Sequence, residues 1–457
     1  MSEEIKNTVN RTEKSANAAK IIIAVALALL IAAAAFTAGF FTGNCAVSDD
    51  ARSLDWLLKT IEENYYFYDD FDADGAGEDS LKSIADKLDI YSEYYTAEEY
   101  AAEQNDNRGR KSGVGISYGY LSGVSGVCDD GGIFLYSVVG NSPAYRAGLV
   151  AGDVLVSGTY GGTTTQFTDK AAFAEFMEKV GDNESFTLST KESDFTVARQ
   201  EYKASYTFMA TCESAWEFVG TADGGLTLGE NLAKKKDLPE DTAYVSLSQF
   251  YGTAAEELGI LFDKFEETGK SKLILDLRNN GGGYVSVMQS ISGYFTAGID
   301  GARSAGYAEY KNGRRQVFDI KKQGRGLISA DTDVYVLTNS GTASASEALI
   351  GVLVSYGVLD YKNIFVSDFS KEYLDMQGDG AKTGRTYGKG IMQSTFVNDW
   401  TGEAVKLTTA KIFWPNGKCI HGSGLSAADG CTVVPAKWSV TKDDAELGEV
   451  LKIIESR

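Results

Sequence analysis

The stretch Gly341-Thr342-Ala343-Ser344-Ala345-Ser346-Glu347 joins an apolar segment at 334–337 to a segment whose apolar residues recur with helical spacing. These apolar residues are Leu349, Val352, Leu353 and Tyr356, which fall on one face of an α-helix. A turn of small residues from a strand into a helix places a serine hydroxyl at an element end, beside free backbone N–H groups. The stretch therefore predicts a strand–turn–helix unit with Ser344 as a candidate nucleophile.

A nucleophilic serine needs a base, and the chain offers two candidates. The single histidine, His421, lies in a glycine-bracketed turn with no carboxylate beside it, where a histidine is more often structural. The alternative is a lysine that burial keeps neutral near pH 7. Lys389 stands between two glycines, and Gln393, four residues later, can hydrogen-bond its amine. Gly-Lys-Gly is also common in ordinary loops, so these residues alone leave both bases open.

Strand and helix patterns alternate around this unit from 242 to 350. Strands are predicted at 243–247, 272–277 and 333–337, and a helix at 253–268 that stops at Gly269. Such alternation predicts an α/β core with partly parallel strands. Functional residues are expected at the carboxyl ends of those strands, where both Ser344 and the glycine triplet 281–283 are placed.

Two further units precede this core. Residues 53–107 have a helical pattern, in which Thr96 and Glu99 have the spacing of a helix N-terminal cap. Residues 111–202 contain the run Asn141-Ser142-Pro143-Ala144 followed by Ala147-Gly148-Leu149 and Gly152-Asp153, and here the chain resembles a PDZ domain. Its carboxylate-binding loop would be Gly113, Val114, Gly115 and Ile116, whose N–H groups would receive a chain terminus while the peptide adds a strand to the sheet edge.

Composition and charge bear on location and partners. The 457 residues carry a net charge of −21, too acidic for a nucleic-acid-binding surface. Residues 21–41 form a charge-free apolar run that is long enough to span a bilayer. Four basic residues precede it, so the positive-inside rule predicts residues 1–20 in the cytoplasm and the rest outside. A cleaved signal peptide is the alternative, but the run is long for one, and we expect a retained anchor in the cell membrane.

The cysteines do not suggest a disulfide framework. Five are scattered along a long chain, of which Cys419 and Cys431 flank a turn and could pair outside the cell. With one histidine, the sequence offers no cluster with metal-ligand spacing, and we expect neither a metal nor a cofactor.

In this order, the segments resemble the C-terminal processing peptidases, a family of PDZ-containing serine peptidases with a Ser-Lys catalytic pair. The matching motifs are Asp276–Gly283, Ala343–Glu347, Thr386–Gly390 with Gln393, Leu407–Ala410, and Leu88–Ser92 with Glu98–Tyr100. The resemblance implies a multidomain α+β and α/β protein with a crotonase-like peptidase core over 203–457. It also implies that Ser344 is the nucleophile, Lys389 the general base and Gln393 the residue that positions the lysine. The N–H groups of Gly282 and Ala345 would form the oxyanion hole.

The chain departs from the family pattern in several places. An insert at about 360–382, which carries Asp368, Glu372, Asp375 and Asp379, lengthens the interval between Ser344 and Lys389 and is expected to be a surface excursion. Ser355 replaces a usually acidic residue, a Gly-Glu-Pro is missing near Gly384, and 424–429 is a loosened form of a glycine–proline–aspartate turn.

Two functions are therefore weighed. The first is a membrane-anchored extracytoplasmic serine endopeptidase that cuts C-terminal regions of proteins and could form a homo-oligomer. The second is a catalytically inactive adaptor that binds protein tails, which would result if the insert displaces Lys389 from Ser344.

Overall fold

The computed structural model describes residues 49–71, 81–124, 128–371, 373–374, 381–437 and 444–456. The anchor expected at 21–41, with its signal-peptide alternative, lies outside these ranges. Across the ranges that are described, no helix is both long and apolar enough to cross a bilayer.

An eight-stranded sheet forms the core, with the strand order β13-β12-β11-β14-β15-β18-β19-β22. Its strands are β11 Thr207–Ala210, β12 Ala215–Gly220, β13 Leu226–Glu230, β14 Thr242–Leu247, β15 Lys272–Asp276, β18 Asp333–Thr338, β19 Ile364–Phe369 and β22 Thr432–Ala436. The five strands β14, β15, β18, β19 and β22 are parallel to one another, as the alternating pattern predicts. The remaining pairs are antiparallel.

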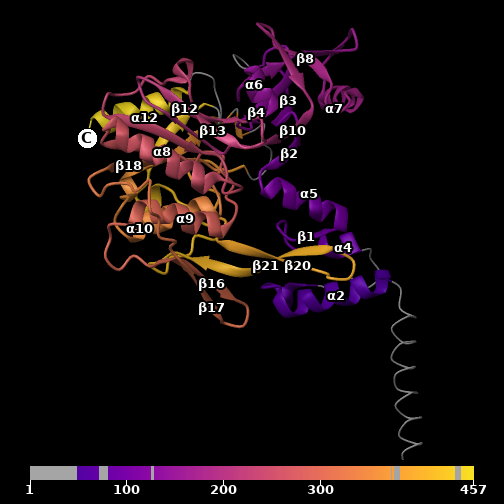
Figure 1. Ribbon diagram of the computed structural model, residues 1–457. Coiled ribbons are helices and arrows are strands. Elements are labelled where there is room, and N and C mark those ends of the chain that lie inside the picture. Colours follow the sequence, from indigo (N-terminus) through magenta and orange to yellow (C-terminus); the bar gives the residue numbers. More distant parts are fainter. Residues whose placement is uncertain are drawn as a thin grey trace, which may run out of the picture.

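Helices cover both faces of this sheet (Figure 1). On β15, Leu273 and Leu275 belong to the cluster formed with α8 Ala254–Thr268, α9 Val285–Thr296 and α10 Ala345–Ser355. Ile274, between them, faces the other way and packs with α12 Ala445–Glu455. Because alternate residues of a strand point to opposite faces, a strand covered on both sides must be apolar throughout, and Leu273–Leu275 is. Gly269, with φ of 66°, ends α8 as predicted.

The strand β19 corrects one expectation. Residues 360–382 are expected to be a surface excursion, but Ile364–Phe369 lie between β18 and β22 within the sheet, with only Asp368 exposed. The consecutive apolar residues Ile364-Phe365-Val366 explain this burial, since both of their faces are covered. Glu372, Asp375 and Asp379 lie outside the described residues.

A second sheet joins the N-terminal region to the core. It has the order β1-β21-β16-β17, with β20 also paired to β21. These strands are β1 Glu93–Tyr95, β16 Ser304–Tyr310, β17 Arg315–Asp319, β20 Ile391–Val397 and β21 Ala404–Phe413. Leu57 and Ile61 of α2 Asp49–Asn64 pack with Val405 and Leu407 of β21.

The N-terminal region also contains α4 Leu81–Ala85 and α5 Ala97–Asn107, and Thr96 and Glu99 form the predicted capping box of α5. An entirely helical 53–107 is wrong at Glu93–Tyr95, because β21 offers these residues an edge to pair with.

Residues 110–203 form a separate small unit at the far end of the molecule from α2 (Figure 1). Its elements are β2 Arg110–Gly113, β3 Ile116–Leu121, β4 Gly132–Val138, α6 Pro143–Ala147, β5 Val154–Leu155, β6 Ser157–Tyr160, β7 Thr163–Gln166, α7 Lys170–Lys179, β8 Ser185–Ser189, β9 Asp194–Ala198 and β10 Gln200–Lys203. Its own core includes Ile133, Leu149 and Phe173. The strand β3 pairs with β4 alone and is therefore an edge of its sheet.

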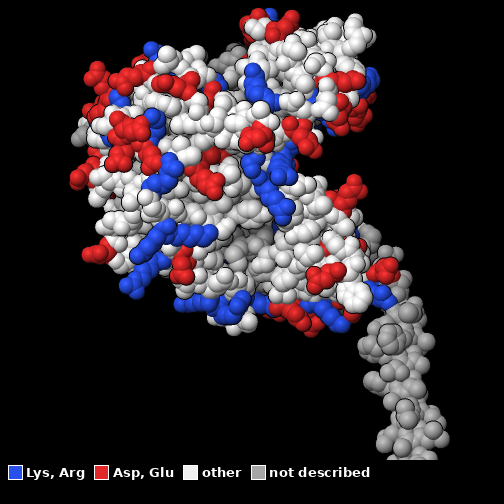
Figure 2. All heavy atoms as spheres, in the orientation of Figure 1, with Lys and Arg blue, Asp and Glu red and all other residues white. Residues whose placement is uncertain are grey.

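Charge is unevenly spread on the face shown in Figure 2. Acidic side chains predominate in the upper part, whereas basic side chains gather in the lower part around β16 and β17. The thiols of Cys419 and Cys431 are free, so the pairing considered for them is not formed.

Candidate active site

Ser344 lies at the turn between β18 and α10, where the carboxyl ends of the parallel strands meet. Its φ of 57° and ψ of −116° place a non-glycine residue in a strained conformation, which persists only where the surroundings hold it. Two neighbouring hydroxyls supply that support: Thr342 donates to Leu277 O at 2.7 Å and Ser346 to Asn280 O at 2.9 Å. Both are fully buried, whereas Ser344 is half-buried and accessible to a substrate.

The glycine triplet lies directly against Ser344. A side chain at Gly282 would come within 2.8 Å of both the Ala345 nitrogen and the Ser344 Cβ, so the close approach requires glycine there. The φ of Gly282 is 100°, which also favours glycine. The structure thus brings Gly282, Ser344 and Ala345 together, but the Gly282 N–H donates to Asn280 Oδ1 at 2.9 Å. An oxyanion could receive this N–H only after it leaves Asn280.

The Glu347 carboxylate connects the turn of Ser344 to the loop of Lys389. One oxygen, Oε2, accepts from the Ser344 N–H at 3.1 Å and from the Lys389 N–H at 2.9 Å. The other, Oε1, accepts from the Thr386 hydroxyl at 2.5 Å and the Gly388 N–H at 2.8 Å. Glu347 is only 1% exposed, and burial raises its pKa. Two loops distant in sequence are therefore tied by one carboxylate, despite the longer interval between them.

The Lys389 amine lies 4.2 Å from the centre of the Tyr91 ring. Burial, and after it the positive charge of Lys406, lower the pKa of Lys389 to about 8, while the charge of Asp89 acts in the opposite direction. A lysine with this pKa is partly neutral at physiological pH and can accept a proton. Within the described ranges, no hydrogen bond joins this amine to the Ser344 hydroxyl.

The hydrogen-bond partner of the Gln393 side chain is Thr408 and not the Lys389 amine that the sequence spacing suggests. It lies on β20 opposite Thr408 of β21, and its side-chain N–H donates to Thr408 Oγ1 at 3.0 Å. His421 is near Lys389 through its backbone, because the loop 420–424 packs on Gly388 and Gly390. Its side chain is exposed and, like the Lys389 amine, makes no hydrogen bond with the Ser344 hydroxyl in the part of the chain that is described.

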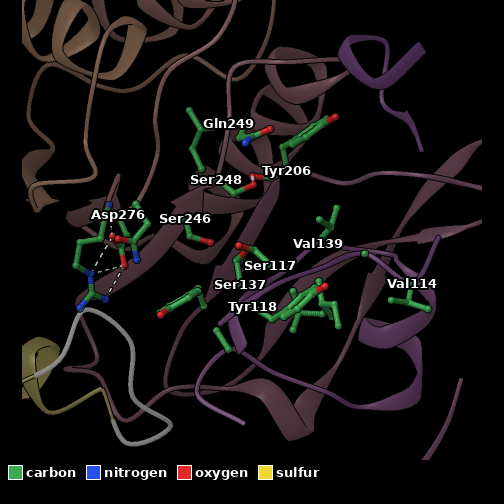
Figure 3. Close-up of a pocket in the computed structure, with 18 of the residues that line it drawn as sticks. Val114, Ser117, Tyr118, Ser137, Val139, Tyr206, Ser246, Ser248, Gln249 and Asp276 are labelled. Carbon is green, nitrogen blue, oxygen red and sulfur yellow. Dashed lines mark hydrogen bonds and ion pairs between the residues drawn. The ribbon is translucent and has the colours of Figure 1, made fainter. Parts of the chain in front are cut away.

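A cavity of about 950 Å³ lies between the 110–203 unit and the core sheet. In Figure 3, Val114, Ser117 and Tyr118 face it from one side, and Ser246, Gln249 and Asp276 from the other. The predicted loop residues Gly113, Gly115 and Ile116 also line it, as do Phe173 and Met177 of α7. Asn279, three residues before Gly282, lines the core side, whereas Gly282, Ser344 and Lys389 are not among the lining residues.

Three residues at this site were not among the expected functional residues. Glu347 stands three positions after Ser344, which is the spacing of a capping box and could have drawn attention to it. Asp89 and Tyr91 lie in the segment before the 110–203 unit that carries part of the family resemblance, but nothing local in the sequence relates them to Lys389.

Comparison with known proteins relates this chain to one group of serine peptidases. Residues 241–360 match the family model described as Peptidase family S41. The carboxy-terminal processing protease CtpA of Bacillus subtilis is 26% identical over 422 residues, which cover 88% of this chain and 75% of that protein. The chloroplastic C-terminal processing peptidase of Tetradesmus obliquus is 26% identical over 380 residues, 80% of this chain and 70% of that protein.

A solved structure supports the fold. The S41 protease from Bacteroides fragilis has a TM-score of 0.57 and 16% identity, with 88% of this chain and 97% of that chain covered, which is a likeness of fold alone. The sequence matches, and not this likeness of fold, show a region of peptidase family S41 at residues 241–360 and make the chain a serine-type peptidase related to the carboxy-terminal processing proteases.

Proposed function

We propose that the protein is a membrane-anchored serine endopeptidase that cuts C-terminal regions of proteins outside the cytoplasm with a Ser344–Lys389 catalytic pair. The observation that carries the pair is the Glu347 Oε2 oxygen, which binds the N–H groups of both residues at 3.1 and 2.9 Å. Because both nitrogens contact one oxygen, the two backbones are held side by side. The lysine side chain, which lies against the Tyr91 ring, would then turn toward the serine hydroxyl.

The chemistry follows from these groups. Neutral Lys389 takes the Ser344 proton as Oγ attacks the peptide carbonyl, and the lysine then gives that proton to the leaving amine. The resulting acyl-enzyme is hydrolysed by water, activated by the same lysine. The developing oxyanion would be bound by the Ala345 N–H and by the Gly282 N–H once it leaves Asn280. Each such donor contributes about 3–4 kcal/mol to transition-state stabilisation.

The 110–203 unit is suited to capture the substrate tail in the manner of a PDZ domain. The edge strand β3 and the helix α7 line the same cavity, with Ile116 and Tyr118 on the strand and Phe173 and Met177 on the helix. A peptide can add to such an edge strand while its terminal side chain enters the apolar side of the cavity. Because Asn279 lines the same cavity, the peptide would be directed from this unit toward the glycine triplet.

The predicted anchor at 21–41 would keep the peptidase near the bilayer. Seven residues separate it from Asp49, where α2 begins, and a fully extended chain of that length reaches about 25 Å. The N-terminal region would therefore face the membrane, with the 110–203 unit at the distal end.

A fluorophosphonate probe tests the proposal without knowledge of the natural substrate. The nucleophilic oxygen displaces fluoride and forms a P–O bond, so the wild-type chain should be labelled and Ser344→Ala should not. Lys389→Ala should lose labelling by about a hundredfold or more, as expected when a general base is removed. Ser290→Ala, which changes a partly exposed serine on α9, is the matched control and should label normally. Labelling of Ser344→Ala at the wild-type rate would overturn the assignment, and an unlabelled wild type would favour the tail-binding adaptor.

A further inference from the structure

The turn between α4 and β1 lies outside the residues that match the family model, yet it contacts the proposed base. Tyr91 in this turn places its ring 4.2 Å from the Lys389 amine, and its hydroxyl donates to the Tyr387 hydroxyl at 2.7 Å. Asp89 holds the turn in shape, because its Oδ1 accepts from the Tyr91 N–H at 2.9 Å. The N-terminal region thus forms one wall of the lysine site.

Asp89 is also the end of a directed hydrogen-bond chain. Gln393 Nε2 donates to Thr408 Oγ1 at 3.0 Å, and the Thr408 hydroxyl donates to Asp89 Oδ1 at 3.2 Å. An ionised carboxylate only accepts, so the single proton of Thr408 must point to Asp89. Thr408 can then only accept from Gln393, which fixes the amide with its N–H group toward Thr408. The carbonyl oxygen of Gln393 is left as the acceptor for an ammonium group.

The second oxygen of this carboxylate, Oδ2, takes no part in this chain of hydrogen bonds. Asp89 Oδ2 is buried and accepts no hydrogen bond in the described part of the chain. Tyr65 also interacts with this carboxylate, because burial, the charge of Asp89 and a side-chain hydrogen bond to it together raise the pKa of Tyr65 to about 12. A negative charge on a buried oxygen is unfavourable unless hydrogen-bond donors or a positive charge approach it.

Of the charged groups that act on the Lys389 amine, Asp89 is the one that favours its protonated form. Lys406 on β21 opposes a positive charge on Lys389, and Asp89 favours it. The Glu347 carboxylate already accepts four hydrogen bonds, one of them from the Lys389 backbone. The hydroxyls of Tyr91 and Tyr387 bond each other, and burial followed by that bond raises the pKa of Tyr91.

We propose that Asp89 is a positioning residue for the peptidase reaction: it orients Gln393 through Thr408 and stabilises the Lys389 ammonium that forms when the serine loses its proton. This inference rests on the proposed Ser-Lys pair. It means that the N-terminal region completes the active site, and that the peptidase core depends on a turn about 300 residues distant in sequence.

The test is the pH dependence of fluorophosphonate labelling in the full chain. Asp89→Asn removes the charge that favours the protonated lysine, so the midpoint of the rise in rate should move to lower pH. The plateau rate should fall about ten- to a hundredfold, because a misplacement of about 1 Å at a catalytic group costs roughly that much. Thr408→Val breaks the chain but keeps the charge, so it should lower the plateau and leave the midpoint in place. Asp89→Glu should recover part of the plateau.

Asp86→Asn, an exposed carboxylate three residues earlier, is the matched control and should change neither quantity. An unchanged midpoint in Asp89→Asn, with wild-type and control chains labelled normally, would overturn the inference while the Ser-Lys pair stands. If Asp89→Asn does not fold, Thr408→Val and Asp89→Glu decide: wild-type plateau rates in both would overturn it. Absence of labelling in the wild type would instead overturn the proposed function.

Discussion

Replacement of Lys389 by methionine should abolish activity and stabilise the protein at the same time. Folding lowers the pKa of Lys389 from 10.5 to about 8, chiefly by burial, so the folded state disfavours the charged lysine. Each pKa unit corresponds to about 1.4 kcal/mol, which makes the cost of burying this charge about 3 kcal/mol at pH 7. Methionine has similar length and no charge, and loses only the contact of the ammonium with the Tyr91 ring, about 0.5–1 kcal/mol. A net gain of about 2 kcal/mol is expected.

The sign of the pH dependence makes this prediction specific. Below pH 8 the lysine is charged in both folded and unfolded chains, and the folded state bears the full cost. Between pH 8 and 10.5 the folded lysine is neutral while the unfolded one still binds a proton, so wild-type stability rises with pH in this window. The advantage of Lys389→Met should therefore shrink through that range and vanish above it.

The assay is urea unfolding of both proteins at pH 7 and pH 10.5, followed by circular dichroism, with labelling of Ser344 measured in parallel. Lys362→Met, an exposed lysine near β19, serves as the control and should leave stability within about 0.5 kcal/mol of wild type. Equal stability of Lys389→Met and wild type at pH 7, or an advantage that persists at pH 10.5, would refute the reasoning about a desolvated lysine.

Further predictions concern the parts of the site. The labelling rate of the wild type should rise about ninetyfold from pH 6 to pH 9, since the neutral fraction of a lysine with a pKa of about 8 grows by that factor; a flat profile would exclude Lys389 as the base. Glu347→Gln should leave two of four buried donors without an acceptor, at about 1–3 kcal/mol each, and faster hydrogen exchange in peptides that cover 344–350 and 386–392 would report it. Gly282→Ala should lower activity at least a hundredfold, because its methyl group would lie 2.8 Å from the Ala345 nitrogen; near-normal rates would show that the triplet can move away. Ile116→Asp should raise KM for a tail-bearing peptide at least tenfold with kcat unchanged, and a fall in kcat alone would argue against tail capture.

Local patterns account for what could be predicted correctly. The helix over 254–268, its stop at Gly269, the capping box at Thr96 and the parallel strands around Ser344 all follow from the spacing of apolar residues and from cap residues. The strand Ile364–Phe369 carried the same kind of signal, but the interpretation of 360–382 as an insert obscured it. Such features depend on neighbours within a few residues, so the chain itself displays them.

The nature of the protein as a peptidase and the choice of Ser344 and Lys389 as candidate residues were thus determined by the sequence. Only the tertiary structure decided how they are held: Glu347 spans 42 positions to reach the Lys389 backbone, and Asp89 lies 319 positions from Thr408. It also decided that the Gly282 N–H is bound to Asn280 and that burial lowers the pKa of Lys389 to about 8. These properties arise from packing between distant segments, and the exclusion of water that shifts a pKa exists only once those segments have met.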